Sequence, residues 1–211
     1  MIEATQTLGE EIANSVSHGV ALLVALASLP FLIVAASHLN VSYIIGVGVF
    51  AVTMVMLYLT STLYHALPVS RAKRIVLKLD HGAIYLFIAG SYTPFALSAM
   101  TDTMSWIMFV VVWSLAISGA ILKLFDKLTK PWLSTGLYVA IGWIVLIATL
   151  PLIERMPELV KVWLIAGGVA YTVGVIFFIL DSRLKYAHAI WHCFVILGTA
   201  SHYMAVFRFE I

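Results

Sequence analysis

The sequence predicts an all-α membrane protein with seven transmembrane helices, and two observations lead to this fold class. First, 63% of the 211 residues are hydrophobic and only 10% are charged, whereas about half of a soluble domain is apolar and about a quarter is charged. Second, apolar runs long enough to cross a bilayer recur along the whole chain. Because a backbone exposed to lipid must satisfy its own hydrogen bonds, each run is expected to form a helix.

The candidate spans follow one another in what we expect to be a single domain of residues 1–211. Short polar segments with Pro, Ser, Asp or Lys separate them, as is typical of loops. Three glycines of the sixth run, Gly167, Gly168 and Gly174, indicate close packing against a neighbouring helix. The expected spans are residues 15–37, 42–66, 75–98, 104–124, 132–151, 159–180 and 187–207.

The twelve Lys and Arg residues predict which way the chain crosses the membrane. Positive residues accumulate in cytoplasmic loops, and most of them here fall on the side of the N-terminus. We therefore expect the N-terminus in the cytoplasm and the C-terminus outside, the reverse of a G-protein-coupled receptor. The side of the N-terminus holds Arg71, Lys73, Arg74, Lys78, Lys123, Lys127, Lys130, Arg183 and Lys185, and the other side holds Arg155, Lys161 and Arg208.

Charge and cysteine content exclude other classes of protein. The single cysteine, Cys193, cannot form an internal disulfide or a CxxC metal or redox motif. A net charge of +2 gives no indication of nucleic-acid binding. The expected partners are therefore membrane lipids and not nucleic acids.

Polar residues from distant parts of the chain are expected at the cytoplasmic ends of the spans. His65 closes the second span, Asp80 opens the third, and His188 and His192 open the seventh. Ionisable residues within spans normally face the bundle interior or a wet cavity, where they are functional candidates. Spacings of three or four place side chains on one helix face, as for His188 with His192. The same spacing relates Ser61 to His65 and links Glu11, Asn14 and His18 in the first span.

Three histidines from two helices suit a zinc site. A catalytic zinc ion takes three protein ligands and keeps a fourth position for water, and it lowers the pKa of that water to about 7, giving hydroxide at neutral pH. Asp80 would orient the water, act as general base, support a ligand or be a ligand itself. A purely structural polar cluster is the alternative for His65, His188 and His192. For Asp80 the alternative is a charge that favours a helix N-terminus.

Four motifs carry a resemblance to a known family. They are EEIANSVSHG (10–19), STLYHAL (61–67), LDHGAIYLFIAGSYTPF (79–95) and AHAIWHCFVILGTASHY (187–203). In this order they resemble the bacterial hemolysin III proteins, the prokaryotic branch of the progestin and adipoQ receptor family. The chain is most similar to the inner-membrane members from Gram-negative bacteria, which implies a multi-pass protein of the bacterial inner membrane.

The resemblance also implies a site and a chemistry. Adiponectin receptors of this family bind zinc near the cytoplasmic face through histidines that match His65, His188 and His192. An aspartate that contacts their zinc through water matches Asp80, and Ser61 matches the serine of their second-helix motif. These receptors and the related alkaline ceramidases are thought to hydrolyse lipid amides such as ceramide.

Three hypotheses for the function remain open from the sequence. The first is a zinc-dependent intramembrane hydrolase of a lipid amide or ester, with Asp80 as catalytic residue. In it, Ser61, Glu11, Asn14 and His18 would support the metal ligands. The second is a sensor or regulator of membrane lipid or energy homeostasis with a structural zinc. The third is a cytolysin or channel, which would need a polar stripe through the whole membrane.

Overall fold

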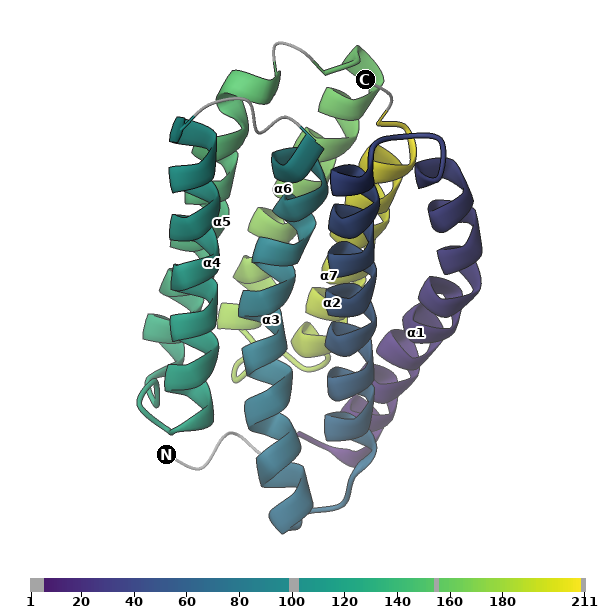
Figure 1. Cartoon of the computed structure of the whole chain (residues 1–211). Helices are drawn as coiled ribbons and strands as arrows, with labels where there is room; N and C mark the ends of the chain where they lie inside the picture. The colour runs from purple at the N-terminus through teal and green to yellow at the C-terminus, as the bar shows by residue number, and fades with distance from the viewer. Residues whose placement is uncertain (1–5, 99–102, 154–155, 210–211) are drawn as a thin grey trace.

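The computed structural model describes residues 6–98, 103–153 and 156–209, and the regular structure in these residues is entirely helical. Figure 1 shows the helices running side by side along one common direction. The predicted all-α class is confirmed. The helices are α1 (Leu8–Ala36), α2 (Val41–Ala66), α3 (Arg71–Ser98), α4 (Thr103–Leu124), α5 (Pro131–Ile153), α6 (Glu158–Ile179) and α7 (Ala187–Phe207).

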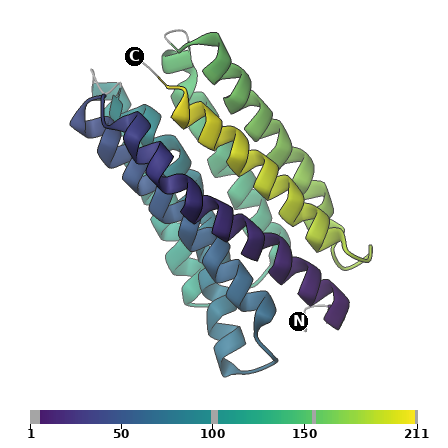
Figure 2. The ribbon, with the colours of Figure 1, turned by 90° about the vertical axis from the view of Figure 1, so that its right-hand side faces the viewer.

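The helices form a closed arrangement in which α3 occupies the middle. Neighbours in sequence pack against one another, and α1 closes the bundle by packing against α7, as Figure 2 shows from the side. The third helix contacts α2, α4, α5 and α7. The start of α1 and the loops that precede α3, α5 and α7 lie at one end of the bundle, the lower end in Figure 1. We call this the basic end, because nine of the twelve Lys and Arg residues fall there. Arg155, expected at the opposite end, lies outside the described residues.

Six of the seven helices are long and apolar enough to cross a membrane, and α3 is the exception among the described residues. Its first turns carry several charges, including Lys78 and Asp80. Its position explains the lower hydropathy, because a helix covered by four others needs little surface that is compatible with lipid. Large side chains such as Tyr85 and Phe95 are fully buried against its neighbours. The outer helices instead expose large apolar side chains, for example Phe31 and Ile147.

Two helices begin at least four residues earlier than their apolar runs predict, whereas the other starts differ by one residue or less. The first helix starts at Leu8, ahead of the expected residue 15, and α3 starts at Arg71, ahead of residue 75. At the start of α1, Thr7 and Glu10 form a capping box, in which the Thr7 N–H donates to Glu10 Oε2 over 2.8 Å. This reciprocal bonding satisfies free backbone donors and stabilises a polar first turn. The extra turns matter, since they place Glu11 and Asn14 at the basic end.

Small residues let α6 approach α7 closely. A Cβ atom added at Gly167 would lie 2.3 Å from Cδ2 of the His202 ring and 3.1 Å from the Gly198 carbonyl oxygen. One added at Gly174 would lie 2.8 Å from the Trp191 ring. The adjacent Gly168 faces away from α7 and has nothing within 4 Å. Of the three glycines that the sequence marked for packing, two serve this contact.

The neighbouring glycines Gly167 and Gly168 provide a matched test of this packing. We expect Gly167→Ala to lower the free energy of unfolding by about 1–3 kcal/mol, because the new methyl group overlaps His202. Gly168→Ala should be neutral or stabilising by up to about 1 kcal/mol, since alanine is the better helix former. Thermal unfolding of both variants in detergent measures the difference. Equal stabilities would contradict the close α6–α7 contact.

Candidate metal centre

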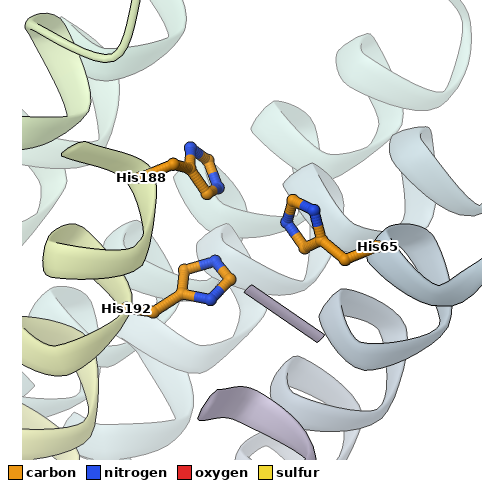
Figure 3. Close-up of side chains that lie close together, drawn as sticks. All are labelled: His65, His188 and His192. Carbon is orange, nitrogen blue, oxygen red and sulfur yellow. The ribbon is translucent and has the colours of Figure 1, made fainter. Parts of the chain in front are cut away.

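Three histidines from two helices meet at the basic end of the bundle. His65 ends α2, and His188 and His192 lie one turn apart at the start of α7. Each offers a ring nitrogen, and the three nitrogens lie within 4.8 Å of one another. Figure 3 shows the three rings turned toward a common centre. His65 and His192 are buried and His188 is half-buried, so this group of donors can hold a metal ion.

Each of the three imidazoles is held by a hydrogen bond at Nδ1. The partner of His65 is Glu11 Oε2 at 2.8 Å, and that of His188 is Asp181 Oδ2 at 3.0 Å. The Nδ1 of His192 lies 3.2 Å from the backbone carbonyl oxygen of Asn14. Carboxylate and carbonyl oxygens only accept hydrogen bonds, so Nδ1 must carry the proton in all three rings.

The opposite nitrogen, Nε2, is therefore the one available for a metal. A neutral ring protonated at Nδ1 has its free lone pair at Nε2. In His65, Nε2 is buried and has no hydrogen-bond partner, which is costly in an apolar bundle unless the atom binds something. Metal-binding histidines commonly donate their second ring N–H to a carboxylate or carbonyl, which fixes the tautomer and the ring orientation. The donor set thus fits a metal that prefers imidazole ligands, as zinc, copper, iron and nickel do.

The first helix supplies most of the groups around the three histidines. The His18 ring stacks on His192, with ring centroids 3.6 Å apart and an angle of 7° between the planes. Its Nδ1 lies 2.7 Å from Ser61 Oγ. The Ser17 hydroxyl lies 3.1 Å from His192 Nδ1. Ser61 therefore contacts His18, whose ring stacks on His192.

Asp80 lies on α3 and is buried, with 8% of its surface exposed. Its carboxylate does not belong to the group of donors that lie within 4.8 Å of one another. The three histidines thus form the candidate ligand set in the described residues, and the catalytic role of Asp80 stays a prediction.

Comparison with known proteins gives the family. Residues 6–203 match the family model described as haemolysin-III related. The chain belongs to the haemolysin III family. It is 39% identical over 201 residues to the Hemolysin-3 homolog of Bacillus subtilis, covering 95% of this chain and 94% of that protein. It is also 39% identical over 207 residues to Hemolysin-3 of Bacillus cereus, covering 98% and 94%.

A human relative connects this haemolysin III chain with the animal proteins. The monocyte to macrophage differentiation factor is 27% identical over 179 residues, covering 80% of this chain and 69% of that protein. The resemblance carried by the four motifs, including the relation to the progestin and adipoQ receptor family, is confirmed. Family membership and six apolar helices together make the chain a multi-pass membrane protein.

The sequence pattern did not identify two residues that support the candidate metal centre, Lys73 and Asp181. Lys73 donates to Glu11 Oε1 over 2.7 Å and to the Leu67 carbonyl oxygen over 3.1 Å. It thereby balances the charge of the carboxylate that holds His65. Asp181 lies in the loop before α7, where its carboxylate reaches back to His188. In the sequence, Lys73 indicates only the orientation of the chain, and Asp181 indicates only a loop.

Metal content tests the candidate centre directly. We expect the wild-type protein to bind about one zinc ion per chain, as three protein ligands with one open position would. His192→Ala should lose most of this metal, because two imidazoles bind far more weakly than three. His38→Ala is the matched control, since His38 is exposed between α1 and α2 at the opposite end. Elemental mass spectrometry after zinc loading and dialysis measures all three. Equal metal in the wild type and His192→Ala would contradict the assignment.

Proposed function

We propose that this haemolysin III protein is a zinc-dependent intramembrane hydrolase that cleaves an amide or ester bond of a lipid at the cytoplasmic leaflet. The observation that carries the proposal is the convergence of three imidazoles whose Nδ1 atoms are all engaged elsewhere. The three rings offer nitrogens within 4.8 Å of one another, and a catalytic zinc ion with three protein ligands keeps a fourth position for water. Structural zinc sites in proteins are usually closed by four protein ligands, so a three-histidine set favours chemistry.

The proposal includes a topology of seven spans with the N-terminus in the cytoplasm of a bacterial inner membrane. The third helix is counted as a span because it connects α2 with α4, two apolar helices that each cross the bundle from end to end. The basic end then faces the cytoplasm, according to the positive-inside rule. This places the candidate metal centre at the depth of the lipid headgroups and upper acyl chains.

The proposal assigns a role to each of the candidate site residues. His65, His188 and His192 would hold the zinc, which when bound supplies Lewis-acid activation of water and of a carbonyl group. Glu11 and Asn14 keep the ligand tautomers fixed through Nδ1. The Asp80 carboxylate would accept the proton of the attacking water and return it to the leaving amine or alcohol. Water thus adds across the carbonyl carbon–nitrogen or carbon–oxygen bond, which breaks.

A lipid is the proposed substrate class because the candidate metal centre lies at an end of the bundle where an apolar outer surface meets basic residues. The outer faces of the helices expose apolar side chains along most of their length, for example Val24 on α1 and Val169 on α6. The ends near the site carry Lys and Arg residues. An amide or ester bond between a headgroup or backbone and an acyl chain lies at this boundary in a bilayer.

A cytolytic function is the alternative that the names of the two Bacillus relatives support. It requires a polar path through the full thickness of the membrane, whereas the described cluster of metal-binding donors lies at the basic end. Leakage of dye from liposomes that contain the purified protein would favour this alternative. A homeostasis sensor with structural zinc would instead keep its metal and show neither leakage nor lipid hydrolysis.

Asp80 separates hydrolysis from metal binding. We expect Asp80→Asn to keep the zinc content of the wild type but to lose about 10²–10⁴-fold in turnover, which is the usual contribution of a general base. Asp126→Asn is the control, because Asp126 is an exposed carboxylate at the same end that pairs with Lys78. Release of fatty acid from ceramide-type and ester lipids in proteoliposomes is the measurement. Full turnover by Asp80→Asn would refute its role as base.

Labelling of single cysteines tests the topology. In a Cys193→Ser background, Ser182→Cys and His38→Cys place one exposed thiol at each end of the bundle. If the basic end is cytoplasmic, a membrane-impermeant maleimide added to spheroplasts should label the thiol at position 38 only. Both should react after the membrane is permeabilised. Labelling at position 182 in sealed spheroplasts would reverse the proposed orientation.

A further inference from the structure

Gln6, which precedes the first turn of α1, joins two parts of the candidate metal centre. Its Nε2 lies 3.3 Å from Asp181 Oδ1 and 3.5 Å from Oδ2, and its Oε1 accepts a hydrogen bond of 2.7 Å from Asn14 Nδ2. This amide orientation is fixed by chemistry, because a carboxylate can only accept and so requires the NH₂ group. Gln6 uses both ends of its amide, one as donor and one as acceptor.

The two residues that Gln6 contacts also hold two of the three candidate ligands, although Gln6 contacts the side-chain amide of Asn14 and His192 donates to its backbone carbonyl. Asp181 Oδ2 accepts from His188 Nδ1 at 3.0 Å, and the Asn14 carbonyl oxygen accepts from His192 Nδ1 at 3.2 Å. A continuous path of hydrogen bonds therefore runs behind the site from His188 through Asp181, Gln6 and Asn14 to His192. The path links the start of α1 with the loop before α7.

A second contact between the same segments bypasses the ligands. Glu10 Oε1 accepts a hydrogen bond of 2.9 Å from the backbone N–H of Tyr186. This contact also fastens the start of α1 to the loop before α7, but it ends on backbone and on an exposed tyrosine. Of these two described contacts, the Gln6–Asp181 contact continues to a candidate ligand, His188, whereas the Glu10–Tyr186 contact does not. Substitutions can therefore separate their effects.

We propose that Gln6 and Asp181 are a positioning pair that sets the metal affinity by orienting His188 and His192 together. The proposal rests on the proposed metal centre and deepens it. Asp181 holds His188 in the tautomer that presents Nε2. Gln6 holds the Asp181 carboxylate in place and connects it with the residue that orients His192. Partners of this kind typically contribute 10–100-fold to metal affinity.

The test measures zinc affinity by competition with a chelator and the visible spectrum of the cobalt(II)-substituted protein, which reports ligand geometry. We expect Asp181→Ala to weaken zinc about 10–100-fold and Gln6→Ala about 10-fold. Gln6→Ala should add little when Asp181 is already removed, because the two act through one path. Asp126→Ala is the control for loss of an acidic side chain at the same end of the bundle.

Glu10→Ala distinguishes a role in orienting the histidines from a role in merely holding the start of α1 against the loop before α7. It removes the Glu10–Tyr186 contact and weakens the helix cap, so thermal stability should fall while zinc affinity and the cobalt spectrum stay close to wild type. A purely structural role of the α1 start predicts the opposite, namely equal losses of affinity for Glu10→Ala and Gln6→Ala. That result would overturn the proposal.

Moving the carboxylate from position 181 to position 6 tests the same contact without removing either side chain. Gln6→Glu alone places a carboxylate against Asp181, so zinc affinity should fall. With Asp181→Asn in the same chain, the new amide donates to the carboxylate at position 6 and still accepts from His188. The double variant should therefore bind zinc more tightly than Gln6→Glu alone, and no gain would count against the pair.

Failure of the proposed function is distinguishable from failure of this inference. If zinc binds and Gln6 and Asp181 behave as expected but no lipid is hydrolysed, the positioning pair stands and the hydrolase is refuted. If zinc binds and all variants match the wild type, the pair is refuted and the metal centre stands. If the wild type binds no metal, both are overturned.

Discussion

The arrangement of the basic end depends on hydrogen bonds from buried and half-buried imidazole N–H groups to fixed acceptors. Burying a polar group in apolar surroundings without a hydrogen bond costs about 2–7 kcal/mol. Glu11, Asp181 and the carbonyl of Asn14 each accept one such bond. These bonds fix the proton of each ring at Nδ1 and leave the lone pair at Nε2. The Nε2 atoms are then available to bind a metal.

The same bonds explain the place of α1 in the bundle. This helix carries none of the three candidate ligands, yet it supplies Glu11 to His65 and Asn14 to His192, and His18 stacks on His192. Its polar first turns are stable because Thr7 and Glu10 cap them. A carboxylate near apolar surroundings needs a counter-charge, and Lys73 from the start of α3 provides it for Glu11. Residues from α1, α2, α3 and α7 are therefore interdependent at this end.

Packing in the rest of the bundle holds α2 and α7 at the distance that the site requires. The central α3 lies against both helices, and α6 supports α7 through the contacts that Gly167 and Gly174 permit. These contacts are apolar and close, so they resist deformation.

The sequence by itself determined the helical class, the approximate bounds of the helices and the end of the bundle at which the polar residues lie. These follow from the length of apolar runs and from the position of charges relative to them, which are local properties of the chain. His65, His188 and His192 could be grouped in this way because each stands at the same end of its span. The capped start of α1 and the central position of α3 did not follow from the sequence, because hydropathy reflects contact with lipid and does not reveal which helices cover one another.

Only the tertiary structure decided which residues hold the imidazoles. Gln6 and Asp181 lie 175 positions apart, and Lys73 meets Glu11 only because the start of α3 lies beside that of α1. Gln6 and Asp181 lie outside helices, so no helical periodicity in the sequence indicates their contact. Ser61 shares a face with His65 by spacing, yet it bonds His18 in place of a cluster histidine. Spacing fixes a face of one helix, whereas the partner of that face is set by how neighbouring helices pack.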